Sequence, residues 1–204
     1  MSRADAPYGG GPGENSEELV KELLQESDWS VKELRKASDD GYAPMLEGTD
    51  LRLVDFQVHD AERRTRYIEV KSKKEAVYFG VENEHRHGWE QAQHSDYIRF
   101  SREFTEDPVY VFVHERDTGV ILRQRLRNLS PVQRIDDEAK LAAYNSDEPM
   151  VVFARDDFEV VTDDVSQYFA GFGQTGIVKE DIDICPFGDD SRDQFGLSDF
   201  GGDD

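Results

Sequence analysis

The stretch YIEVKSK, residues 67–73, has the alternation of apolar and charged side chains that is typical of a half-buried β-strand. Successive side chains on a strand point to opposite faces, so Glu69 and Lys71 share one face while Ile68 and Val70 enter an apolar layer on the other. The strand therefore presents a carboxylate and an ammonium group side by side.

The segments around this strand predict the order helix, strands, helix, strands. Residues 50–58 (DLRLVDFQV) and 64–72 (RTRYIEVKS) are rich in β-branched and aromatic residues, and a polar loop joins them as an antiparallel hairpin. Capping signals followed by apolar residues at helical spacing predict helices before this hairpin, and the polar stretch after it is predicted to be helical. The predicted helices span residues 16–26, 30–37 and 83–104, and a second hairpin joins residues 108–115 to 119–126 across RDTG.

The paired charges suit phosphodiester hydrolysis. That reaction needs a divalent cation held by carboxylates, a water made nucleophilic near the cation, and a positive group facing the transition state. Glu69 can contribute to holding the cation and Lys71 can supply the positive group. A second carboxylate from the preceding strand would complete the metal site, because magnesium prefers oxygen ligands. Asp50 and Asp55 are both candidates for it.

These motifs resemble the PD-(D/E)xK nuclease superfamily: Gly48-Thr49-Asp50 is followed, after a hairpin, by Glu69-Val70-Lys71. The resemblance implies an α/β fold with a restriction-endonuclease-like core, in which a central mixed sheet is flanked by helices, and Mg²⁺ or Mn²⁺ as the cofactor. It makes Asp50 the first choice as the metal ligand beside Glu69, because Asp50 follows a Gly turn at a strand start. Asp55 is the alternative ligand.

Further motifs extend the resemblance over about residues 16–115. Gln93 and Tyr97 are similar to the Gln-x-x-x-Tyr motif of the RecB-like branch, which implies that they orient the site and contact the substrate; four residues apart, they lie on one helix face. Asn83-Glu84 before a helix is similar to the NO VEIN C-terminal type of nuclease domain. The superfamily's leading helix often contributes a Glu, which would be Glu18 or Glu22 here.

The charge balance is strongly acidic. The chain has 24 Lys and Arg against 45 Asp and Glu, a formal net charge of -21, and the acidic residues occur along its whole length. Molar salt shortens the Debye length to about 3 Å and removes the resulting self-repulsion, so the composition predicts a protein of a halophilic archaeon or its virus. Imitation of nucleic acid and binding of a basic partner are the competing explanations.

Sequence features also predict the compartment and the domains. Cys185, a single cysteine, excludes an internal disulfide, and the absence of a signal-like or 18-residue apolar stretch predicts a cytoplasmic or virion-associated protein without a membrane span. The expected division is a flexible leader (1–15), a nuclease-like core (16–130), an acidic C-terminal α+β extension packed on the core (131–185) and a disordered acidic tail (186–204).

The leading functional hypothesis is a metal-dependent deoxyribonuclease whose catalytic residues are Asp50, Glu69, Lys71, Gln93 and Tyr97. Six basic residues within 62–74, and three arginines that alternate along a later strand, are consistent with DNA as the partner. The alternatives are an inactive nuclease-like fold that binds a protein partner through its acidic C-terminal third, and an ordinary halophile protein in which the Glu-x-Lys strand is coincidental. The sequence leaves a homodimer open.

Overall fold

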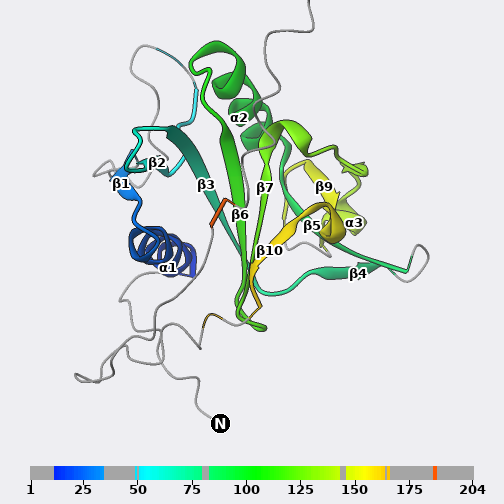
Figure 1. The fold of residues 1–204 in the computed structure, drawn as a ribbon. Helices are drawn as coiled ribbons and strands as arrows, with labels where there is room; N and C mark the ends of the chain where they lie inside the picture. The colour runs from blue at the N-terminus through cyan, green and yellow to red at the C-terminus, as the bar shows by residue number, and fades with distance from the viewer. Residues whose placement is uncertain are drawn as a thin grey trace, which may run out of the picture.

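The computed structural model describes residues 12–34, 49, 51–79, 83–142, 146–163, 165 and 186–187, with the backbone alone at 12–14 and 139. Within these ranges the chain forms two sheets and several helices (Figure 1). The elements are α1 (Pro12–Glu26), β1 (Ser30–Glu33), β2 (Phe56–His59), β3 (Thr65–Lys73), β4 (Val77–Phe79), β5 (Glu84–Glu90), α2 (Gln91–Glu103), β6 (Val109–Glu115), β7 (Val120–Arg125), η1 (Leu126–Asn128), β8 (Gln133–Ile135), α3 (Glu138–Leu141), β9 (Met150–Ala154), η3 (Arg155–Asp157) and β10 (Glu159–Thr162).

The larger sheet has the strand order β1-β2-β3-β6-β7-β10 (Figure 1). Strands β3 and β6 pair in parallel, and the other neighbours pair antiparallel. The predicted hairpins β2–β3 and β6–β7 are both confirmed, but β2 begins at Phe56, so residues 51–55 of the first predicted strand lie outside it. The expected fold class, α/β with a central mixed sheet flanked by helices, is therefore confirmed. The order of α1, three strands, α2 and β6, with β4 and β5 inserted before α2, follows the predicted order of helix, strands, helix and strands.

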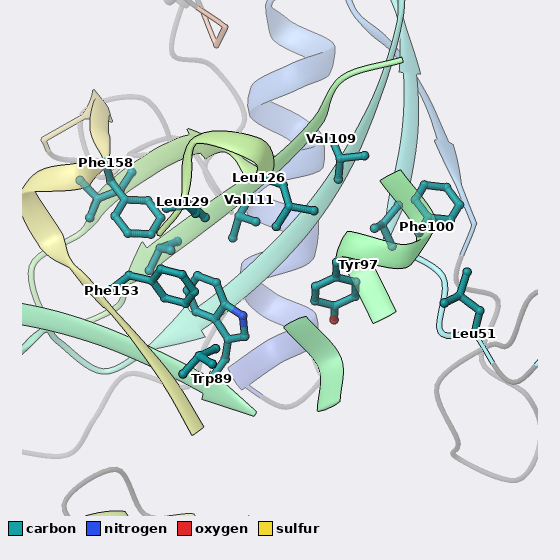
Figure 2. Packing of buried hydrophobic residues seen from close by; sticks show 14 residues of the cluster. Leu51, Trp89, Tyr97, Phe100, Val109, Val111, Leu126, Leu129, Phe153 and Phe158 are labelled. Carbon is teal, nitrogen blue, oxygen red and sulfur yellow. The ribbon is translucent and has the colours of Figure 1, made fainter. Parts of the chain in front are cut away.

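Each face of this sheet is covered by its own apolar cluster, because strand side chains alternate. On one face, the α1 residues Leu19, Val20, Leu23 and Leu24 pack against strand residues that include Ile68. On the other face, α2 contributes Tyr97 and Phe100 to a cluster with Val109, Val111 and Val113 of β6 (Figure 2). The charged residues Glu69 and Lys71 belong to this second face, since Ile68 and Val70 belong to the first.

A smaller sheet, in the order β4-β5-β9-β8, lies on the α2 side and was not predicted. The prediction of one helix over 83–104 was wrong in its first part, because Glu84–Glu90 forms β5 and the helix begins at Gln91. The reason is long-range pairing: β5 pairs with β9, and Trp89 stacks on Phe153 with ring centroids 4.2 Å apart (Figure 2). Local polarity could not reveal a strand whose partner lies about sixty residues later.

The predicted helix over 30–37 was also wrong at its start. Ser30–Glu33 forms β1, which pairs antiparallel with β2 at the sheet edge. Trp29 and Val31 pack against the α1 cluster, so tertiary packing and backbone pairing outweigh a weak local preference for helix. Helix α1 begins at Pro12, ahead of the predicted start at 16, with proline where its missing N–H costs no helical hydrogen bond.

The C-terminal third contributes strands to both sheets. β10 joins the larger sheet beside β7, and β9 lies between β5 and β8 in the smaller one. These two strands are separated by the short helix η3. The prediction that the chain from 186 lies outside the fold was wrong for Phe187, which is buried against Trp29 because burial removes its large apolar ring from water.

A buried ionic cluster links the two sheets. Glu115, at the end of β6, accepts hydrogen bonds from His87 Nε2 of β5 (2.8 Å) and from Arg155 Nε and Nη2 (2.7 and 2.9 Å). Burial alone would raise the pKa of Glu115, but these hydrogen bonds outweigh it and lower that pKa to about 2. Burial lowers the pKa of His87, so its neutral ring donates the Nε2 proton. The cluster therefore joins the larger sheet, through Glu115 of β6, to the smaller sheet, through His87 of β5, by buried hydrogen bonds.

Replacing Glu115 by Gln is expected to lower the free energy of unfolding at neutral pH by about 3 kcal/mol, because it removes the negative charge of a buried cluster and replaces one of the two acceptor oxygens by an NH2 donor. The folded pKa of Glu115 is below its ordinary value of 4.5, so this contribution is present above about pH 4.5 and is lost as pH falls toward about 2. Denaturant unfolding at pH 7 and pH 3 measures both effects.

The matched control is Glu159→Gln, because Glu159 pairs with Arg123 but is 64% exposed. We expect this control to change stability by less than about 1 kcal/mol. Equal losses in the two variants, or a difference between wild type and Glu115→Gln that does not shrink in acid, would contradict the role given to the cluster.

Candidate active site

Four of the residues singled out from the sequence meet between β3 and α2. The Lys71 ammonium donates to Glu69 Oε1 at 2.7 Å, to Gln93 Oε1 at 2.6 Å and to the Tyr97 hydroxyl at 3.0 Å. The Tyr97 hydroxyl in turn donates to Glu69 Oε1 at 2.6 Å. We call Glu69, Lys71, Gln93 and Tyr97 the polar cluster.

Local periodicity explains the convergence. Glu69 and Lys71 share a strand face, and Gln93 and Tyr97 lie one helical turn apart on the side of α2 that faces β3. The Tyr97 ring is buried in the apolar cluster, with its hydroxyl pointing away from the aliphatic side chains of Val111 and Leu126 (Figure 2). The helix is thus anchored by apolar contacts that hold its polar groups against the strand.

The residue directly before α2 adds a carboxylate that was not predicted from the sequence. Gln93 Nε2 donates to Glu90, the last residue of β5, while Gln93 Oε1 accepts from Lys71. Glu90 also lies 3.6 Å from a guanidinium nitrogen of Arg52. The Gln93 amide therefore connects the polar cluster to a second acidic residue, Glu90. Its two hydrogen bonds also fix the orientation of the amide.

Asp55 lies next to the polar cluster, in the residue before β2. Its side chain is 2% exposed, and Oδ2 accepts the backbone N–H of Val70 at 2.7 Å. Burial, together with the negative charges of Glu69 and Glu17, raises the pKa of Asp55 well above its usual range. Asp50, the first choice for this ligand position, lies outside the described residues.

Helix α1 also brings an acidic residue near the site. Glu17 is the residue whose negative charge contributes to the raised pKa of Asp55, whereas Glu18, one of the two candidates from the resemblance, pairs with Lys21. The sequence could have indicated Glu17, because Glu17 stands three and seven residues before the apolar residues Val20 and Leu24 and so shares their helix face. Both of these residues are fully buried. The helical period therefore places Glu17 nearer the core than Glu18.

The chemistry of these carboxylates fits a hard divalent cation. Asp55 and Glu69 are buried and act on each other as like charges, and a cation beside them would offset both the burial and the repulsion. Within the described ranges, no group of three His, Cys, Asp or Glu residues is arranged to hold a metal ion. Asp55 and Glu69 are thus the two described residues that fit the cation best, and the position of Asp50 is not described.

Several of the basic residues noted in the sequence have local partners. Arg64 pairs with Asp60, Lys74 lies 3.6 Å from Asp117, and Arg123 pairs with Glu159. Arg66 is buried, with its guanidinium over the Trp29 and Phe187 rings at 4.5 and 4.6 Å. Several of these cations therefore serve local ion pairs or packing, and Lys71 is the one in the polar cluster.

Comparison with known proteins gives a distant structural likeness. No family model and no curated protein matches the sequence. The fold is similar to a solved structure of Archaeoglobus fulgidus Hjc, a Holliday junction resolvase from an archaeal hyperthermophile, with 13% sequence identity and a TM-score of 0.44. The match covers 72% of this chain and 88% of that chain. In the described part of the chain, no helix is long and apolar enough to cross a membrane.

Proposed function

We propose that this protein is a metal-dependent nuclease that hydrolyses DNA phosphodiester bonds. The observation that carries the proposal is the polar cluster itself: a buried carboxylate, an ammonium group, an amide and a phenol meet on one sheet face, beside the second buried carboxylate of Asp55. A coincidental Glu-x-Lys strand gives no reason for Gln93 and Tyr97 to bond the same ammonium group.

The proposed roles follow from the chemistry of each side chain. Asp55 and Glu69 would hold Mg²⁺ or Mn²⁺, with Asp50 as a further candidate ligand. The cation, when bound, would lower the pKa of a water and stabilise charge on the phosphate. Lys71 places a positive charge where the phosphate becomes more negative in the transition state. Gln93 and Tyr97 hold the Lys71 ammonium in position, so that little reorganisation is needed when substrate binds.

The test is cleavage of supercoiled plasmid and linear duplex DNA in molar potassium chloride with Mg²⁺, Mn²⁺ or a chelator. Wild type should cut with either metal and not with the chelator. Lys71→Met should reduce the cleavage rate by about a hundredfold or more, as expected on removing a group that stabilises transition-state charge. Lys74→Met is the matched control, because Lys74 is a nearby lysine with 59% of its side chain exposed.

If wild type cuts no DNA in any metal or salt tested, hydrolysis is the wrong function. If it cuts and Lys71→Met cuts equally well while staying folded, the nuclease assignment survives only at another site. Circular dichroism of each variant separates a lost catalytic group from a lost fold.

A second candidate function is an inactive nuclease-like module that binds a protein partner, for example in a virus particle. Two observations favour it: the bonds within the polar cluster already satisfy the Lys71 ammonium, and the described residues contain no group of three His, Cys, Asp or Glu that could hold a metal ion. The acidic C-terminal third, with 5 basic and 19 acidic residues from Pro131 onward, would then be the partner surface. Failure to bind Mn²⁺ would favour this function.

We also propose that the acidic composition is an adaptation to a cytoplasm of high salt. A net charge of -21 repels DNA at low ionic strength, and this repulsion is screened at molar salt. Counterion release favours DNA binding less as salt rises, so binding must rely on contacts close to the site. Cleavage assays should therefore cover a range of potassium chloride concentrations.

A further inference from the structure

A second lysine follows the polar cluster along β3. Lys73 is two residues beyond Lys71, so the two ammonium groups leave the same face of the strand as Glu69. The Lys73 side chain is partly buried. The nearby charges that act on it are those of Lys71 and Glu90, both of which belong to the site or border it. Lys73 therefore extends the candidate site by one step along the strand.

The cross-strand neighbour of Lys73 is committed elsewhere. Lys73 stands opposite Glu115 in the parallel register of β3 and β6, where oppositely charged side chains commonly pair. The Glu115 carboxylate instead accepts from His87 and Arg155, and it makes no ion pair with Lys73. Because Glu115 is bonded within the buried ionic cluster, it does not pair with Lys73.

In the part of the chain that the structure describes, the Lys73 ammonium makes no hydrogen bond and no ion pair. Burial and the neighbouring Lys71 ammonium lower the pKa of Lys73 to about 8. A partly buried cation without an anionic partner is costly to a fold unless a ligand supplies the anion. The arrangement suits an oxygen anion that approaches the same face as the substrate.

We propose that Lys73 binds a phosphate of the DNA backbone next to the phosphate that reacts at Lys71. This inference rests on the proposed function and deepens it. Same-face residues two apart on a strand are about 6.6 Å apart, a spacing suited to adjacent phosphates of one nucleic-acid strand. Lys73 would position the substrate, since phosphate contacts fix register without reading sequence.

The experiment measures DNA binding and cleavage separately. Fluorescence anisotropy with a labelled duplex, in the presence of a chelator and over a range of potassium chloride, compares wild type with Lys73→Met, Lys73→Arg and the control Lys74→Met. Lys73→Met should weaken binding about tenfold and reduce the salt dependence by about one ion, whereas Lys73→Arg and Lys74→Met stay near wild type. In cleavage assays Lys73→Met should raise KM with little change in kcat.

The outcomes separate this inference from the nuclease proposal. If wild type cuts and Lys73→Met binds and cuts as wild type does, the phosphate contact is overturned and the nuclease stands. If wild type binds DNA without cutting and Lys73→Met binds more weakly, the contact stands and hydrolysis is overturned. If wild type binds no DNA at any salt concentration, both are overturned.

Thermal unfolding tests whether Lys73 is structural. Lys73→Met removes a partly buried cation, so its thermal midpoint should be equal to or higher than that of wild type. A fall of several degrees would mean that Lys73 is structural.

Discussion

Replacing Glu69 by Gln is expected to reduce the rate of DNA cleavage by at least about a thousandfold. The amide keeps the size and shape of the side chain and still accepts a hydrogen bond from Tyr97, but it carries no charge to hold a divalent cation. It also removes the negative charge 2.7 Å from the Lys71 ammonium. Single-turnover cleavage of a labelled duplex with excess enzyme measures the rate without interference from product release.

The matched control is Glu103→Gln at the end of α2, where the carboxylate is 53% exposed and lies 3.8 Å from Arg99. That variant should cut at the wild-type rate. Cleavage by Glu69→Gln within tenfold of wild type would contradict a role for Glu69 in holding the metal.

Replacing Asp55 by Asn is expected to have two opposite effects: a loss of cleavage of at least about a hundredfold and a gain in stability. Cleavage falls because a carboxylate that would hold the cation is lost. Stability rises because the fold disfavours the charged form, since burial and the charges of Glu69 and Glu17 raise the pKa of Asp55. The asparagine carbonyl can still accept the Val70 N–H.

The sign of the stability change sets its pH dependence. The pKa of Asp55 is higher in the folded protein than in the unfolded one. Wild type therefore becomes less stable as pH rises from the unfolded pKa to the folded pKa. Asn carries no charge, so the variant should be the more stable protein at neutral pH and the difference should vanish in acid. In thermal unfolding without metal, the midpoint of Asp55→Asn should be a few degrees higher than that of wild type. A gain of about 1 kcal/mol in the free energy of unfolding gives such a shift in a domain of this size.

A comparison with Asp50→Asn decides between the two candidate ligands. If Asp55→Asn cuts normally and Asp50→Asn does not, Asp50 is the metal ligand, as the Gly turn before it suggested. If Asp55→Asn lowers stability at neutral pH, the charged carboxylate stabilises the fold, which contradicts the raised pKa of Asp55.

The parts of the site that follow from local periodicity could be predicted from the sequence. A period of two places Glu69 beside Lys71, and a period near four places Gln93 beside Tyr97. Both pairs lie on one face of their element in the structure, because β3 and α2 are each long enough to bury an apolar side. The meeting of the two pairs depends on the parallel pairing of β3 with β6, which was not predicted, because the crossover between these strands carries α2 past β3.

The parts that depend on distant pairing could not be predicted. The strand β5 exists because β9 pairs with it, and the β5 sequence EHRHGWE shows no alternation of apolar and polar residues. Glu90 enters the site because that strand ends directly before α2. Glu17 acts on Asp55 through the packing of α1 on the sheet, which the spacing of its leucines suggests without fixing the register.

Binding of Mn²⁺ to the metal-free protein, followed by electron paramagnetic resonance in molar potassium chloride, tests the central claim most directly because it needs no choice of substrate. The site described here predicts that wild type and Glu103→Gln bind one Mn²⁺ per chain, and that Glu69→Gln and Asp55→Asn lose it. Wild type that binds no Mn²⁺, or Glu69→Gln and Asp55→Asn that bind it as wild type does, would contradict the claim that these buried carboxylates form the metal site of a nuclease.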